Sequence, residues 1–437
     1  MGAPIRSRIV FALAASMLAS AATATASEPA GLHQSLDKLA RDEKFSGAVV
    51  VRGPDGVRFA RGYGWANPFE RLAFTPDTPV DSGSLAKPVT SAAVLLLIRD
   101  GRIELDAPVQ RYLPEYPHAS ATVRHLLSHS AGLAFTESLE ALANRSNAEL
   151  LAAADPLLFA PGTAFSYCNL CFMTLALLIE RVSGMHYLAF VRERLAVPPG
   201  VALRPQRLAD WTGRAIGFRS KPDGAIEPFD SWEGELLYGA ANLSISASQL
   251  AQWGSEWWQP RLQALREVAT TAARIGRNES GLTLGNWYCA PTGRRCHYLG
   301  HHEGFHHMLY WDADRRISIA MVSNNALAPA LQQRLQRGLV AFAEDEPDRG
   351  RRELETQFAD RRVAVGRFKL PSGERVEVNA RGRRHFVRRG GLDYPAVLIG
   401  AGIRYVPGLD LYVAGTLDRR LRWLSLYEDF QATPARK

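Results

Sequence analysis

The segment 81–101 places the strongest constraint on how this chain folds. A Ser-Leu-Ala-Lys stretch at 84–87 comes just before the apolar run 91–98. The run ends at Arg99-Asp100-Gly101, and a basic last turn followed by glycine is typical of a helix C-terminus. The pattern therefore predicts a helix of about four turns with Ser84 in its first turn.

Ser84 and Lys87 are three residues apart, so a helix places both on one face. A serine hydroxyl becomes a nucleophile when a base takes its proton, and a lysine whose pKa is lowered in a dry site is such a base. Only six of the 52 basic residues are lysines, and Lys87 is the only lysine between Lys44 and Lys221. Because arginine is not deprotonated in proteins, a lysine here favours a chemical role. S-x-x-K is also common by chance, so the pair is a candidate that needs further support.

The first 26 residues have the layout of a signal peptide. Arg6 and Arg8 form a basic start, residues 9–18 are apolar, and Ala24-Thr25-Ala26 offers an A-x-A cleavage site. The apolar part is too short to span a bilayer. We therefore expect cleavage near Ala26 and a mature protein in the periplasm or outside the cell.

The mature chain is longer than one hydrophobic core usually supports, so we expect two domains. Residues 27–345 would form the first, residues 346–360 a charged linker, and residues 361–437 a small all-β module. The last segment contains 16 Lys and Arg and 7 Asp and Glu, and its net charge of +9 exceeds the +8 of the whole chain. This basic module either docks on an anionic envelope surface or carries a solvated arginine-rich surface.

Residues 27–345 have the pattern of an α/β (α+β) fold around an antiparallel sheet. Alternating residues on either side of Gly53-Pro-Asp-Gly56 predict a β-hairpin. The expected elements begin with a helix at 30–44, this hairpin at 46–64 and a helical insertion at 105–185. They continue with a helix at about 246–253 capped by Ser246 or Ser248, further strands at 297–323 and a closing helix at 330–343.

The loop 161–169 supplies two further candidates. It leads into an apolar helix expected over residues 170–182. Tyr167 and Asn169 are two apart on a turn and can project together. A tyrosine hydroxyl near Lys87 would relay protons, and the Asn169 amide would hold a substrate carbonyl. The alternative is that both residues only shape the turn.

Two histidine patterns resemble metal sites and are interpreted otherwise. His125 and His129 are four apart on a predicted helix, but no third ligand is near, so packed or capping histidines are favoured. Residues 302–306 spell H-E-x-x-H, which binds zinc only when both histidines lie one turn apart on a helix. Their flanks look like strands, in which positions four apart are separated by about 13 Å. We therefore expect no metal and no cofactor.

Four cysteines in an exported chain point to disulfides, with three possible pairings. Cys289 and Cys296 flank turn-forming residues, so we expect a disulfide across a hairpin. Cys168 and Cys171 form a C-x-x-C, compatible with a redox pair, a local disulfide or two free thiols. Without the strand that precedes such a motif in a thioredoxin unit, the last two are favoured.

Three motifs together resemble the serine β-lactamase and penicillin-binding-protein superfamily, and most of all its class C-like branch. They are S-x-x-K at 84–87, Y-x-N at 167–169 and H-x-G at 302–304, in helix, loop and strand contexts. The flanking segments 105–109, 124–133, 159–163 and 179–184 support the resemblance, which covers residues 30–345. This branch includes class C β-lactamases, D-Ala-D-Ala carboxypeptidases, D-aminopeptidases and serine esterases.

The resemblance implies a role for each motif. Ser84 would be the acylated nucleophile, with Lys87 and Tyr167 sharing the general-base and proton-transfer role. Asn169 would bind the carbonyl or amide of the substrate.

The third motif, His302-Glu303-Gly304, would form the far wall of the cleft. The oxyanion hole would combine the backbone N–H groups of Ser84 and Phe305. Many relatives have Lys-Thr-Gly here, and with His301 adjacent the register is open by one residue. An acid at this place disfavours an anionic substrate tail and suits an ester or a substrate with a free amine. No acid-Leu-Asn motif of the class A type follows, so deacylation would depend on the lysine and the tyrosine.

We therefore expect an exported serine hydrolase that acts on an ester or on a D-amino-acid amide or peptide. A β-lactamase or D-Ala-D-Ala carboxypeptidase is the nearest alternative, and a non-catalytic cell-envelope-binding protein is the alternative of another class. The expected partner is a small-molecule or peptide substrate and no nucleic acid. Docking on an anionic cell envelope through residues 361–437 stays one of two alternatives, beside a solvated arginine-rich surface. The oligomeric state stays open.

Overall fold

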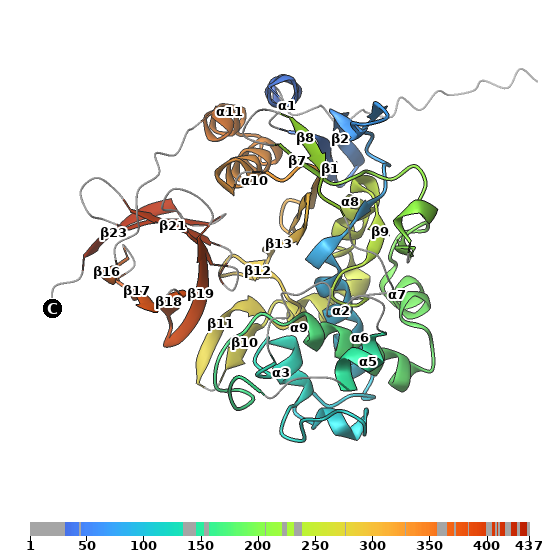
Figure 1. Ribbon diagram of the computed structural model, residues 1–437, viewed down its shortest axis with the longest axis vertical. Helices are drawn as coiled ribbons and strands as arrows, with labels where there is room; N and C mark the ends of the chain where they lie inside the picture. Colours follow the sequence, from blue (N-terminus) through green and yellow to red (C-terminus); the bar gives the residue numbers. More distant parts are fainter. Residues whose placement is uncertain are drawn as a thin grey trace, which may run out of the picture.

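The computed structural model shows a helix-covered sheet with a small barrel packed beside it (Figure 1). The predicted signal peptide, residues 1–26, lies outside the described residues. The described residues are 31–42, 45–133, 146–152, 157–205, 207–220, 225–230, 238–275, 277–327, 329–355, 365–370, 373–382, 384–398, 404–406, 409, 411–415, 421–425 and 429–434.

The centre of the larger part is a six-stranded antiparallel sheet in the order β12-β13-β14-β15-β1-β2. Alternate side chains of β1 enter different cores, because successive residues of a strand point to opposite faces. Val49 and Val51 pack with α1 and α10, whereas Ala48 and Val50 pack with α2. The predicted hairpin is β1–β2, with Gly53 paired to Gly56. The strands are β12 Tyr288–Cys289, β13 Arg295–His302, β14 Phe305–Asp312, β15 Ile317–Ser323, β1 Gly47–Gly53 and β2 Gly56–Tyr63.

Three helices cover one face of this sheet: α1 Leu32–Arg41, α10 Pro329–Ala343 and α11 Pro347–Glu355. The helix α11 lies within residues 346–360, the predicted charged linker, whose helical structure the sequence analysis did not predict. Two glycines allow α10 and α11 to pack closely. A Cβ on Gly338 would lie 2.7 Å from Leu354, and one on Gly350 would lie 2.5 Å from Phe342. The charged outer side of α11 concealed this packing in the sequence.

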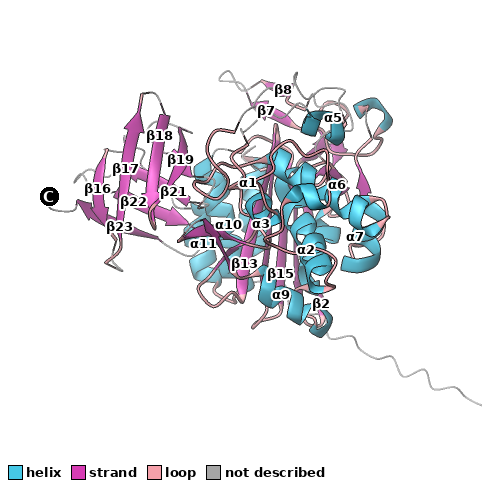
Figure 2. Cartoon of the chain, turned by 90° about the horizontal axis from the view of Figure 1, so that it is seen from below, coloured by secondary structure: helices cyan, strands magenta, loops and turns pink. Residues whose placement is uncertain are grey.

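The helical part lies on the other face of the sheet (Figure 2). Its central helix is α2, Ala86–Arg99, whose residues 86–97 are all buried. Ser246 caps α8 through a capping box with Gln249, as predicted for one of two serines. The other helices are α3 Val123–Leu127, α5 Asn147–Ala152, α6 Asn169–Ser183, α7 Tyr187–Leu195, α8 Ala247–Glu256 and α9 Gln263–Ala269, with short 3₁₀ turns η1 Gly83–Leu85, η2 Val109–Arg111, η3 Leu208–Asp210 and η4 Pro260–Leu262.

Short strand groups complete this part: β5 Val80–Asp81, β9 Leu243–Ile245 and β6 Ala202–Leu203 in one sheet, and the pairs β3 Trp65–Asn67 with β4 Leu72–Ala73, β7 Phe218–Ser220 with β8 Ile226–Pro228, and β10 Ala272–Ile275 with β11 Asn278–Thr283. In the part of the chain that the structure describes, no single helix has the length and apolar composition to cross a membrane. Helices α6 and α7 have the necessary length and apolar composition only when taken together, and they are bent by 77° relative to each other.

The C-terminal residues form a closed barrel of consecutive antiparallel strands, which confirms the predicted all-β character. Pairing of Phe368 with Pro434 joins the last strand to the first. Alternate residues such as Val376 and Val378 are buried, as expected for a barrel strand. The strands are β16 Gly366–Lys369, β17 Arg375–Arg381, β18 Arg384–Arg389, β19 Leu392–Leu398, β20 Arg404–Val406, β21 Leu411–Gly415, β22 Leu421–Ser425 and β23 Asp429–Pro434.

Candidate active site

Ser84 lies in the 3₁₀ turn η1, which continues directly into α2 at Ala86. The carboxylate of Asp81 fixes this turn by accepting the N–H of Gly83 at 2.9 Å. Arg204 holds the same carboxylate, with its Nε 3.3 Å away and its side chain fully buried. Gly83 has a φ of 49°, a conformation that favours glycine. The half-buried serine is therefore presented on a rigid turn at the start of the central helix.

Lys87 is fully buried one turn after Ser84. Its Nζ donates to Ser84 Oγ at 3.0 Å and to the carbonyl of Ala240 at 2.9 Å. Nζ also lies 4.8 Å from the centre of the Tyr167 ring and 5.7 Å from that of Phe172. Burial lowers the pKa of Lys87 below 10.5, and the interaction with Tyr167 opposes this only in part. Deprotonation is thus easier than for a lysine in water.

Tyr167 completes a cluster on the serine. Its hydroxyl donates to Ser84 Oγ at 2.7 Å, so Oγ receives hydrogen bonds from both the phenol and the ammonium of Lys87. The structure brings together the three residues that the sequence proposed as catalytic, although the loop of Tyr167 is far from Ser84 along the chain. Such an arrangement is suited to moving a proton away from the serine and back to a leaving group.

His129 supports Tyr167, and the sequence did not predict this contact. Its ring stacks on the Tyr167 ring at 4.7 Å, and its Nδ1 accepts the N–H of Cys168 at 2.9 Å. Burial, helped by the charge of Lys87, lowers the pKa of His129 to about 3. His125 instead caps α3 through a reciprocal pair of hydrogen bonds with Thr122. Packing and capping, the interpretations favoured above, describe the two histidines.

Asn169 is the first residue of α6 and is half-buried. Its side chain makes no hydrogen bond to any described residue.

A disulfide between Cys168 and Cys171 spans Asn169, and the N–H of Cys171 also bonds to the Cys168 sulfur at 2.9 Å. The local disulfide is therefore the correct choice among the three alternatives. The expected hairpin disulfide, Cys289 to Cys296, joins β12 and β13.

The residues predicted as the third motif lie at the end of a hairpin. His302 ends β13, Phe305 begins β14, and the turn between them contains Glu303 at a φ of 42°. The His302 ring faces the carboxylate of Asp81, with Nδ1 3.8 Å from Oδ2. The segment 302–306 is thus strand, turn and strand rather than one strand. Within the described ranges, no three His, Cys, Asp or Glu side chains are placed to hold a metal.

The strand β13 passes Ser84 earlier, at Gly300 and His301. A Cβ on Gly300 would lie 2.4 Å from the Ser82 carbonyl oxygen, and one on Gly83 would lie 3.0 Å from the His301 carbonyl oxygen. The backbone of β13 therefore lies in direct contact with the turn that carries Ser84, and this contact leaves no room for a Cβ at Gly300 or Gly83.

Tyr298 faces the serine cluster in place of His302. Its hydroxyl lies 3.4 Å from that of Tyr167. The stretch that lines the candidate site is therefore Tyr298-Leu299-Gly300, four residues before the predicted motif. Both stretches, 298–300 and 302–304, end in glycine, so the motif alone does not show which of them lies beside Ser84. The position of the hairpin turn decides this, and that position is known only from the pairing of β13 with β14.

Comparison with known proteins agrees with this geometry. The family described as Beta-lactamase matches residues 32–341. This chain belongs to the Beta-lactamase family. It is a serine hydrolase of that family, as the sequence resemblance implied. Its relatives include esterases, D-aminopeptidases and penicillin-binding proteins.

Two relatives of this Beta-lactamase family chain show the range of similarity. Penicillin-binding protein 4* of Bacillus subtilis is 22% identical over 392 residues, which cover 81% of this chain and 86% of that protein. Esterase EstB of Burkholderia gladioli is 31% identical over 215 residues, which cover 42% of this chain and 54% of EstB. The octameric penicillin-binding protein homologue from Pyrococcus abyssi has the same fold, with a TM-score of 0.60 at 20% identity over 91% of this chain and 97% of that one.

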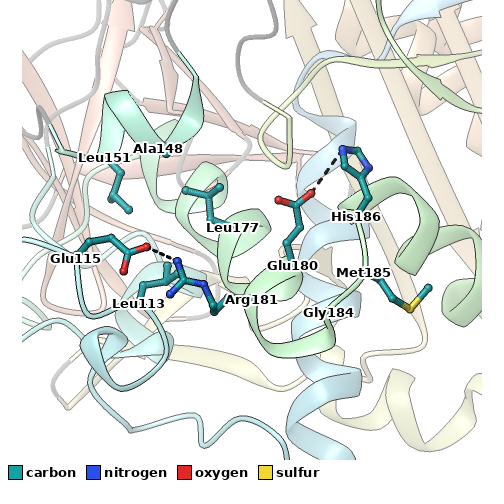
Figure 3. A pocket seen from close by; sticks show the side chains of 10 residues that line it. All are labelled: Leu113, Glu115, Ala148, Leu151, Leu177, Glu180, Arg181, Gly184, Met185 and His186. Atoms are coloured by element: carbon teal, nitrogen blue, oxygen red, sulfur yellow. Dashed lines mark hydrogen bonds and ion pairs between the residues drawn. The ribbon is translucent and has the colours of Figure 1, made fainter.

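A cavity of about 590 Å³ opens at the other end of α6, away from Asn169 (Figure 3). Leu113, Leu151 and Leu177 form apolar parts of its wall. Its polar side chains lie in pairs: Arg181 is 2.7 Å from Glu115, and the His186 ring is 3.7 Å from Glu180. Among the described residues that line this cavity there is no serine or cysteine, so it offers no nucleophile comparable to the Ser84 hydroxyl.

Proposed function

We propose that this protein is an exported hydrolase that forms an acyl-enzyme on Ser84 and cleaves an ester or a D-amino-acid amide or peptide. One observation supports the proposal above all others: Ser84 Oγ lies within hydrogen-bond distance of both Lys87 Nζ, at 3.0 Å, and the Tyr167 hydroxyl, at 2.7 Å. A hydroxyl between an amine of lowered pKa and a phenol is arranged for nucleophilic catalysis.

In the acylation step, neutral Lys87 accepts the proton of Ser84 while Oγ attacks the acyl carbon of the substrate. The new C–O bond forms as the carbonyl becomes an oxyanion. Tyr167 then passes a proton to the departing alcohol or amine, and the bond to the leaving group breaks. Water attacks the acyl-enzyme by the reverse sequence, which releases the acid and restores Ser84.

The proposed oxyanion hole consists of the N–H groups of Ser84 and His301. This replaces Phe305, which is fully buried at the start of β14. The strand β12 pairs with β13 only at His297 and Cys296, so among the described residues no strand covers the edge of β13 beyond Tyr298. Successive N–H groups of a strand point to opposite edges, which leaves donors on that edge for the substrate.

The substrate class follows from Tyr298 and from the relatives. Tyr298 places a neutral hydroxyl at the third motif, where a lysine would attract a carboxylate. Relatives of this chain include an esterase and D-aminopeptidases. These points favour an ester or D-amino-acid derivative over the β-lactam and D-Ala-D-Ala alternatives.

Export is part of the proposal. It is supported by the signal-peptide pattern of residues 1–26 and by two disulfides, which persist in oxidising compartments. An N-terminus of the mature protein close to Ser27, purified from the periplasm or medium, is the expected result.

Intact-mass spectrometry tests the catalytic part of the proposal. The mature protein is treated with a fluorophosphonate and, separately, with a penicillin, and Ser84→Ala serves as the control. We expect a fluorophosphonate adduct on the wild type and none on the variant. Rapid acylation by penicillin would instead favour the β-lactamase alternative. No adduct with either reagent, together with salt-sensitive binding of the protein to cell walls, would favour a non-catalytic envelope protein held by residues 361–437.

A further inference from the structure

The C-terminal barrel touches the loop that carries Tyr167. The ring of Tyr394, on β19, packs against the ring of Phe165 with centroids 5.3 Å apart. Both side chains are buried, Tyr394 with 1% and Phe165 with 5% of its surface exposed. In both views β19 lies on the side of the barrel that faces the sheet and helices (Figures 1 and 2). The buried residues of the barrel and those around α2 form one continuous apolar cluster.

Phe165 also contacts the residue that supports Tyr167. Its ring centroid lies 5.7 Å from that of His129, which stacks on Tyr167. Backbone hydrogen bonds hold the loop on the same support: the N–H groups of Ser166 and Cys168 donate to the carbonyl and to Nδ1 of His129, each at 2.9 Å. The ring of His129 therefore contacts both Phe165 and Tyr167 and links the two residues.

We propose that Tyr394 is a positioning residue for Tyr167, acting through Phe165 and His129. The proposal rests on the function given above, because it assumes that Tyr167 acts on Ser84. Packed interiors leave little free volume, so removal of a buried ring allows its neighbours to shift. A shift of about 1 Å at a catalytic group can cost about 100-fold in rate. The barrel then helps to set the rate of acylation.

The test compares Tyr394→Ala, Tyr394→Phe and Phe368→Ala in the full-length protein. The measured quantities are the maximal rate of Ser84 modification by a fluorophosphonate and the probe concentration that gives half of this rate. Phe368 is a matched control: it is a ring of the same barrel with 3% of its surface exposed, on the strand β16, which lies on the side away from β19. We expect Tyr394→Ala to lower the maximal rate by about 10- to 100-fold at an unchanged half-saturating concentration, and Tyr394→Phe to retain most of the rate.

A double-mutant cycle with Tyr167→Phe separates positioning from general destabilisation. If Tyr394 acts through the Tyr167 hydroxyl, Tyr394→Ala lowers the rate much less in the Tyr167→Phe background than in the wild type. An equal loss in both backgrounds, or an equal loss caused by Phe368→Ala, overturns the proposal. A wild type that is not modified at all refutes the function of Ser84 itself, and the wild-type sample alone reveals that outcome.

Discussion

The ring of His129 stacks on the ring of Tyr167, with centroids 4.7 Å apart and planes inclined by 17°. Because the pKa of His129 is lowered to about 3, the imidazole is neutral at physiological pH. Its Nδ1 accepts the N–H of Cys168, which places the proton on Nε2. The histidine thus supports the phenol without adding a second positive charge beside Lys87.

Acid should destabilise the fold through His129 and His307. Both are fully buried, and burial lowers their pKa values to about 3 and about 4 from 6.5. At pH values between the folded-state pKa values and 6.5, the unfolded chain binds more protons than the folded one. The stability is therefore complete above about pH 6.5 and is lost as the pH falls toward the folded-state values, by up to about 1.4 kcal/mol per pH unit for each histidine.

Urea unfolding measured at several pH values over this window checks the expectation. In the variant His307→Gln, the free energy of unfolding should fall less steeply with decreasing pH than in the wild type. The difference in slope should be the contribution of one histidine, at most about 1.4 kcal/mol per pH unit. Identical slopes in the variant and the wild type would show that His307 is not the group responsible.

Replacement of Lys87 by arginine should remove the base. A guanidinium stays protonated at any accessible pH, whereas burial lowers the pKa of Lys87 below 10.5. Acylation of the wild type should rise with pH through this lowered pKa. In Lys87→Arg the rise should disappear and the rate should fall by about 10² to 10⁴. The pH dependence of fluorophosphonate modification measures both, with Lys369→Arg, an exposed lysine of the barrel, as the matched control.

The hydroxyl of Tyr298 should contribute to acylation modestly. It lies 3.4 Å from that of Tyr167, and loss of one such hydrogen bond costs about 1 kcal/mol, or about fivefold in rate. Tyr310→Phe is the control, since it removes a buried hydroxyl with no hydrogen-bond partner in the described part of the chain. A larger effect of His302→Ala than of Tyr298→Phe would restore the third motif to 302–304.

Alanine at Gly300 should separate β13 from η1. Its Cβ would lie 2.4 Å from the carbonyl oxygen of Ser82, so the strand must move and take the N–H of His301 with it. Loss of one oxyanion donor lowers acylation by about 10² to 10³. Gly366→Ala is the control, because among the described residues its Cβ would approach the Phe368 side chain alone, at an ordinary contact distance of 3.8 Å. Modification of Gly300→Ala at the wild-type rate would refute the assignment of His301.

Elements with local signals were predicted correctly from the sequence. The hairpin at 53–56, the helix cap at one of two serines, which the structure shows to be Ser246, and the shared face of Ser84 and Lys87 all depend on residues a few positions apart. The helix α11 was missed because its charged residues resemble a linker and its buried contacts belong to α10. The hairpin turn at Glu303 was missed because a strand pattern alone does not show where the chain reverses.

The sequence by itself determined the family resemblance, the Ser84–Lys87 pair and the candidacy of Tyr167, since each is a short motif whose chemistry follows from its spacing. Only the tertiary structure decided that the Tyr298 hydroxyl lies beside that of Tyr167, that the backbone of His301 lies against the turn that carries Ser84, and that His129 supports Tyr167. The register of β13 is set by pairing with β14, and the ring stack forms only when two distant loops meet. Neither relationship is encoded by residues that are close together along the chain.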